Sequence, residues 1–291
     1  MKRRRALASG LLLAGALRPD ARAGDELLLR WSPQMGPRAT FRGVLNKDSA
    51  GMGAGQFLYP APNVAGFFAA ILAHAAVNSA ARDAQMLKLQ TNADRVLEPY
   101  SAAIDGLAAD DLLTRTRTAL LPQGLVIRRG WVNANLELTP IFLMTQDRRA
   151  VLLDVAAQFH DGASGAPRQL GMRVVSTPRG TFSAEEDEWA NAEGHALKQV
   201  CVDLLTLAVR HMLDHVDPDR APAATSVERT VRFAEGGTQR MERSRVLEQH
   251  CGRALLLTLS NTLMSVPLLH PPAPGQECPA AMPSPQVATG R

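Results

Sequence analysis

The stretch YPAPNVAGFFAAILAHAAVNSAARDAQMLKLQTNADRVLEP, residues 59–99, contains the longest helical pattern in the chain. Its prolines disfavour a helix before Asn63, because proline lacks the N–H donor and biases the preceding residue toward extended geometry. Apolar side chains at three- and four-residue spacing then predict a helix over residues 64–98, about 50 Å long. We expect this helix to span the domain, protrude from it or bend. Residues 78–83 interrupt the row of bulky apolar side chains, so a bend or emergence from the core is expected there.

The first half of this expected helix, residues 64–77, is apolar nearly all round. One interpretation is that it packs inside the protein's own core. The other is that it offers a surface to a partner helix or a membrane interface, because the apolar side chains around the whole helix have to be shielded from water. In that second interpretation the partner-binding side chains are Phe67, Phe68, Ile71 and Leu72. The segment is too short to span a bilayer.

The first 23 residues have the layout of a secretory signal peptide. Residues 2–5 are basic, residues 6–17 are apolar, and Ala21-Arg22-Ala23 matches an A-x-A cleavage site. The apolar run is shorter than the roughly 20 residues that a membrane-spanning helix needs. We therefore expect a periplasmic or secreted protein that is cleaved near Ala23, with the general secretory and twin-arginine routes both open.

Removal of such a signal peptide changes the charge of the chain. The full sequence has 32 basic and 28 acidic residues, a net charge of +4, and six of the basic residues but only one acidic residue lie within residues 1–23. The remaining chain then carries 26 basic and 27 acidic residues. The apparent basicity belongs to the export signal, so we expect no nucleic-acid partner.

The pattern of elements predicts an α+β fold. We expect an antiparallel sheet of roughly six to eight strands packed with two long helices and one or two shorter ones. Residues 24–269 are expected to form a single domain, with a subdivision near residues 217–226 as the alternative, and residues 270–291 a disordered proline-rich tail. Expected strands cover residues 26–31, 38–45, 125–131, 135–145, 149–160, 169–177, 230–234 and 238–247.

Helices are expected over residues 64–98, 109–121 and 181–216. Residues 248–264 fit either helix or strand, and apolar residues at four-residue steps favour helix. Two hairpins are predicted, one around Asp147-Arg148 and one around Gly236-Gly237. Pro140 predicts that its strand lies at an edge or carries a bulge, because proline cannot donate to the ladder.

The helix over residues 181–216 carries the strongest candidate for a metal site. Ser183 and Glu186 form a capping box at its expected start. Near its end, His211 and His215 are four residues apart, so both imidazoles lie on one face and can reach one metal ion. The alternative is structural, since cationic side chains near a helix C-terminus are favourable without a metal.

Other chemistry has weaker support in the sequence. His160-Asp161 at a strand end is the pair to examine for hydrolysis, with a polar hairpin end as the alternative, and no G-x-S-x-G elbow is present. Cys201 and Cys251 are the expected pair if the exported protein has a disulfide; two buried thiols and one free thiol in the tail, Cys278, are the equal alternative. Asp110-Asp111 is explained by helix capping. No cofactor is predicted.

Two classes of function follow from these observations. The first is a non-enzymatic exported accessory or binding module, which meets another envelope protein or a second copy of itself through an apolar helical face; peripheral membrane contact is a further option. The alternative is a metal-dependent or hydrolytic exported enzyme built around His211 and His215. Carriage of a small apolar ligand between sheet and helices is a third reading.

Overall fold

The computed structural model describes residues 27–45, 81–123, 133–162, 166–179, 187, 189–222 and 227–269. The helices are α2 (Ala81–Asp94), α3 (Ser101–Asp105), α4 (Ala109–Leu120) and α5 (Asn191–Val216), with the 3₁₀ helices η2 (Arg95–Tyr100) and η3 (Leu121–Gln123). The strands are β1 (Leu28–Trp31), β2 (Thr40–Gly43), β3 (Asn135–Met144), β4 (Val151–His160), β5 (Arg168–Val175), β6 (Glu228–Glu235), β7 (Thr238–His250), β8 (Arg253–Thr258) and β9 (Leu263–Pro267). The fold is therefore α+β.

The strands form one mostly antiparallel sheet in the order β1-β3-β4-β5-β9-β8-β7-β6. Strands β1 and β2 both pair with β3 in parallel, β1 along its first half and β2 along its second half. Pro140 lies between these two ladders, which end at Leu138 and resume at Ile141. The sequence predicts an edge or a bulge at this proline; instead the outer strand is interrupted beside it.

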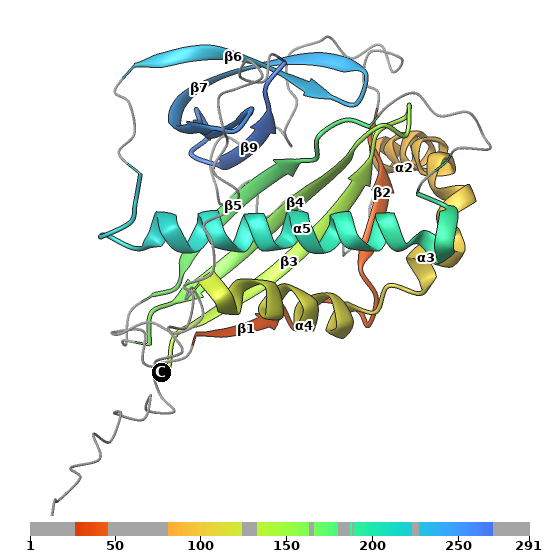
Figure 1. Ribbon diagram of the computed structural model, residues 1–291. Helices are drawn as coiled ribbons and strands as arrows, with labels where there is room; N and C mark the ends of the chain where they lie inside the picture. Colours follow the sequence, from red (N-terminus) through yellow and green to blue (C-terminus); the bar gives the residue numbers. More distant parts are fainter. Residues whose placement is uncertain are drawn as a thin grey trace, which may run out of the picture.

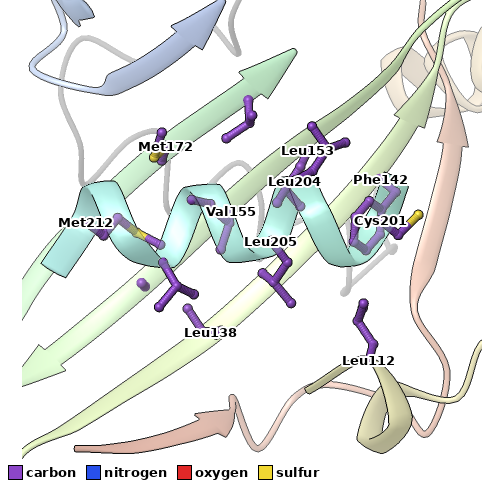
Figure 2. Packing of buried hydrophobic residues seen from close by; sticks show 14 of the residues in the cluster. Leu112, Leu138, Phe142, Leu153, Val155, Met172, Cys201, Leu204, Leu205 and Met212 are labelled. Atoms are coloured by element: carbon purple, nitrogen blue, oxygen red, sulfur yellow. The ribbon is translucent and has the colours of Figure 1, made fainter. Parts of the chain in front are cut away.

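The sheet is covered on one face by α5, which runs across β3, β4 and β5 with α4 beside it (Figure 1). Alternate side chains of a strand point to opposite faces, and those of β4 pack accordingly: Leu153 and Val155 belong to the larger core cluster that includes α5. Figure 2 shows this cluster, with side chains from the sheet, α4 and α5 in contact. Its labelled members are Leu112, Leu138, Phe142, Leu153, Val155, Met172, Cys201, Leu204, Leu205 and Met212.

The other face of the main sheet is covered by strands β6 to β9, which belong to the same sheet. Strand β6 is three places away from β9 in the strand order, yet Phe233 of β6 forms a bridge with Leu268, just after β9. The segment from β6 to β9 is therefore rolled, and its inner side chains form a second core with Leu152 of β4 and Val175 of β5. In Figure 1 the β6–β7 hairpin lies at the top, beside β9, and the second core places Val231 and Phe233 of β6 against Leu152 and Val175 of the main sheet.

Several predicted elements agree with the structure. The helix expected over residues 109–121 is α4, and both predicted hairpins are present as β3–β4 and β6–β7. Among the described residues α5 is the one long helix, with 26 residues. Of the helix expected over residues 64–98, the structure describes α2 and then the tighter η2, which continues through Pro99 to Tyr100.

Two boundaries were predicted wrongly. The helix expected from residue 181 begins at Asn191, because Asp187 lies outside it and Trp189 and Ala190 form a turn. Residues 248–264, where the apolar spacing favours helix, form the end of β7, then β8 and the start of β9. Strand β8 is buried on both faces, so its continuous apolar run mimics a helical pattern.

Some predictions fall on residues outside the described part of the chain. These are the signal peptide and its cleavage near Ala23, the apolar helical segment at residues 64–77, the strand at residues 125–131, the capping box of Ser183 and Glu186, and the tail at residues 270–291. They stay predictions. Of the helices that the structure does describe, none has both the length and the apolar character needed to cross a bilayer.

The contact between β2 and α2 generates the first test. A Cβ atom on Gly43 would clash with the carbonyl oxygen of Ala93, whereas one on Gly36 would meet nothing within 4 Å. We expect Gly43→Ala to lower the free energy of unfolding by about 1–3 kcal/mol, because backbone has to move to admit the methyl group. Urea denaturation measures this, with Gly36→Ala as the matched control. Equal midpoints for the two variants would show that this approach of β2 to α2 is wrong.

Candidate functional site

The β6–β7 hairpin is held in place at its turn. Gly236 and Gly237 connect the two strands, and Gly236 has a φ of +61° that favours glycine. The Gly237 N–H donates to Oδ2 of Asp147 at 2.5 Å, and Asp147 Oδ1 also accepts from Thr145 Oγ1 and from the Arg149 N–H. Burial raises the pKa of Asp147, but these hydrogen bonds outweigh it and lower the pKa overall. An ionised Asp147 thus joins the β3–β4 turn to the hairpin tip.

The inner face of the hairpin covers a buried ion pair. Asp154 of β4 is 0% exposed and accepts from Nε of Arg173, directly opposite on β5, at 2.5 Å. Above them, the side chains of Glu242 and Ser244 on β7 point inward. Glu242 pairs with the buried Val231 of β6, and Ser244 pairs with Arg229, two residues before Val231 on the same face of the strand. The polar groups of this layer are therefore enclosed between the main sheet and the hairpin.

Among the polar groups enclosed between the main sheet and the hairpin, Glu242 is the titratable side chain that comes from the hairpin. Burial raises its pKa, and the nearby Arg173 guanidinium partly opposes the increase. Ser244 is fully buried, and its Oγ has no hydrogen-bond partner among the residues that the structure describes. Glu242, with its raised pKa, therefore lies near the Asp154-Arg173 pair on the inner face of the hairpin, and the described groups offer no nucleophile with an adjacent base.

The outer face of the hairpin carries exposed arginines around an exposed methionine. Cross-strand pairs place Thr230 opposite Arg243 and Arg232 opposite Met241, and all four side chains are exposed. Met241 is 63% exposed. Arg243 approaches Glu228 at 3.3 Å, a surface ion pair of little energetic weight. We call Thr230, Arg232, Met241 and Arg243 the outer hairpin face.

The predicted metal pair lies on consecutive turns of α5. His211 is buried, and burial first, then Arg210 and Arg253, lower its pKa to about 3. Burial and Arg168 lower the pKa of His215. Both imidazoles are therefore neutral near pH 7, the form that binds metals. Within the described ranges, however, no group of three His, Cys, Asp or Glu side chains could hold a metal ion, and the metal site stays a prediction.

The other predicted residues are spread over the fold. His160 ends β4 opposite Asn135, and Asp161 follows it at the surface. Asp110 and Asp111 lie in the first turn of α4, where negative charge is favourable.

The proposed disulfide is absent. Cys201 is buried in the core side of α5, whereas Cys251 is exposed in the β7–β8 turn, so the thiols are not bridged. Burial raises the pKa of Cys201, and Asp203 adds to the increase, which disfavours a reactive thiolate. Phe67, Phe68, Ile71 and Leu72 lie outside the described residues.

Comparison with known proteins gives no further assignment. No family model matches the chain, and no curated protein and no solved structure is significantly similar to it. The site must therefore be interpreted from its own geometry.

Sequence reasoning missed the Asp154-Arg173 pair and the outer hairpin face. Asp154 gave a signal, because it is a single carboxylate among the apolar residues 151–157 of β4, and a buried charge needs a partner. The partner could not be named without the register of β4 against β5. The arginines of β6 and β7 resemble ordinary surface charges until the strand pairing places them on one face.

The buried pair generates a stability test. Asp154→Asn leaves the Arg173 guanidinium buried without its counter-charge, and we expect a loss of about 3–5 kcal/mol. The double variant Asp154→Leu with Arg173→Met removes both charges and should lose less than the single variant. Urea denaturation gives both values. A double variant that is less stable than Asp154→Asn would contradict this account.

Buried His211 generates a pH test. Its folded-state pKa of about 3 lies below the usual 6.5, so between these values the unfolded chain binds a proton that the folded protein excludes. Stability therefore falls as pH decreases through this window, by up to about 1.4 kcal/mol per pH unit. His211→Gln should flatten this dependence, whereas His250→Gln, at an exposed position, should not. Parallel pH profiles for wild type and His211→Gln, measured by urea denaturation, would refute the assignment.

Proposed function

We propose that the protein is an exported binding module that acts by contact with another envelope protein, and that the outer hairpin face forms part of the contact. The observation that carries this proposal is the exposure of Met241 between Arg232 and Arg243 on a firmly attached hairpin. Arginine and methionine are both enriched at protein interfaces. Export itself is supported by the signal-peptide pattern of residues 1–23.

The chemistry of this face favours a partner that is acidic and partly apolar. Arg232 and Arg243 supply positive charge, and one weak surface ion pair with Glu228 leaves Arg243 free to exchange partners. Met241 supplies an adaptable apolar contact, since its unbranched side chain fits irregular surfaces. The apolar helical surface predicted at residues 64–77 would add to the contact area. A second copy of the chain is the alternative partner, and the experiment below separates the two.

The firm attachment of the β6–β7 hairpin to the main sheet also favours a binding function. Asp147 fixes the turn, and the inner face packs Val231 and Phe233 into the second core. A surface that is ordered before binding loses less conformational freedom in the complex, so more of the contact energy appears as affinity.

The test is capture from an envelope extract with the mature chain, residues 24–291, as bait after cross-linking. The charge reversal Arg232→Glu with Arg243→Glu should lower recovery of the partner about tenfold, because like charges then face each other. Lys88→Glu, at an exposed position of α2, is the matched control and should leave recovery unchanged.

Three outcomes would count against the proposal. The first is that the wild-type chain recovers no protein above a bead-only control. The second is that the double charge reversal recovers the same proteins in the same amounts as wild type. The third is sedimentation of the pure mature chain as a dimer that the reversal dissociates, which would assign the outer hairpin face to self-association.

A further inference from the structure

The cysteines of the chain differ in what they can reach. Cys201 is 0% exposed on the core side of α5, so the fold shields it from a second thiol. Cys251 is exposed in the turn between β7 and β8. Cys278, in the tail, is the remaining cysteine of the sequence. Cys251 is therefore the described cysteine that is accessible to a second thiol, and Cys278 is the partner that the chain itself can supply.

The turn that carries Cys251 is unusual for this residue type. Cys251 and Gly252 connect the paired residues His250 and Arg253, and their φ angles are +50° and +71°. Two-residue hairpin loops with two positive φ angles favour Asn-Gly or Asp-Gly, because in most other residues the Cβ atom crowds the backbone in this conformation. The backbone geometry thus gives no reason for a cysteine at this position.

The chain returns to this turn just before the tail begins. Strand β8 pairs antiparallel with β9, so the end of β9 lies beside the turn that precedes β8. Leu268, directly after β9, donates its N–H to the carbonyl oxygen of Gly252 at 2.7 Å. The last described residue is Leu269. The tail therefore starts next to Cys251, the neighbour of Gly252 in the turn.

Cys278 is close enough along the chain to reach the turn. It follows Leu269 by nine residues, which span up to about 30 Å when extended, whereas the Cα atoms of a disulfide are about 5.5–6 Å apart. Pro274-Gly275, between them, is a dipeptide typical of turns, which would let the chain reverse its direction. A tether this short gives the Cys278 thiol an effective concentration of roughly millimolar at Cys251, well above that of a second copy of the protein in dilute solution.

We propose that Cys251 and Cys278 form a disulfide in the exported protein, which ties the C-terminal tail to the β7–β8 turn. One thiolate attacks a sulfur of a disulfide oxidant, and the second thiolate then displaces the oxidant from the mixed disulfide. The two thiols lose two protons and two electrons, and the oxidant leaves as a dithiol. Oxidants of this class act in the compartments that exported proteins enter. The proposal shares with the contact function only the expectation of export from residues 1–23.

The disulfide closes a loop that contains β8 and β9. These strands supply Leu256, Met264 and Val266 to the second core. Closing the loop reduces the conformational freedom of the unfolded chain, so the cross-link stabilises the rolled part of the sheet. Reduction should therefore lower the midpoint of urea denaturation by about 1 M.

The experiment maps the thiols of the mature chain isolated from an envelope extract, after acid quenching and alkylation with iodoacetamide in urea. Trypsin releases Cys251 in residues 246–253, Cys278 in residues 254–291 and Cys201 in residues 199–210. We expect an alkylated Cys201 and a linked species of the other two peptides, which reduction splits into its parts. Non-reducing electrophoresis should show a monomer.

Cys278→Ser should leave Cys251 open to alkylation and remove the response of the urea midpoint to reduction, whereas the matched control Cys201→Ala should keep the linked peptides. The proposal is overturned if Cys251 and Cys278 are both alkylated before reduction. It is also overturned if Cys251 is linked instead to Cys201, to a second copy of the chain or to a small thiol. The charge-reversed variant Arg232→Glu with Arg243→Glu should keep the disulfide, so failure of either proposal leaves the other standing.

Discussion

Strand β4 is covered on both faces, by α5 on one and by the rolled strands β6 to β9 on the other. Leu153 and Val155 face the helix, while Leu152 and Asp154 face the roll. A strand with no wet face leaves a charged residue nowhere to reach water, so Asp154 requires a partner inside the protein. Arg173 supplies it from the next strand, and the roll must then close over both charges. The position of the β6–β7 hairpin follows from this enclosure.

Local patterns in the sequence predicted the parts of the fold that depend on neighbouring residues. The hairpins at Asp147-Arg148 and Gly236-Gly237 and the helix α4 have turn residues or periodic apolar positions next to one another, and they are found as expected. The error at residues 248–264 has a physical cause. Strand β8 packs Leu255 and Leu257 into one core and Ala254 and Leu256 into the other, so burial on both faces removed the alternation that identifies a strand.

Features that depend on contacts between distant segments could not be predicted in this way. The roll of the sheet is defined by Phe233 and Leu268, and the ion pair by the register of β4 against β5. The same holds for the environment of His211. Its spacing from His215 suggested a shared metal, whereas its lowered pKa comes first from burial and then from Arg210, beside it, and Arg253, on a distant strand. Spacing along one helix contains no information about the strand that packs against it.

Buried Arg173 and partly buried Arg253 show how the same residue type can have opposite consequences. Arg173 is matched by a carboxylate on the adjacent strand, so its charge is satisfied within the protein and contributes to holding the roll closed. Arg253 is held just as firmly, but by carbonyl and hydroxyl oxygens that orient the guanidinium without neutralising it. Because these neutral acceptors supply no counter-charge, burial is the main cause that lowers the pKa of Arg253, to about 10, whereas the carboxylate of Asp154 offsets the cost of burying the charge of Arg173.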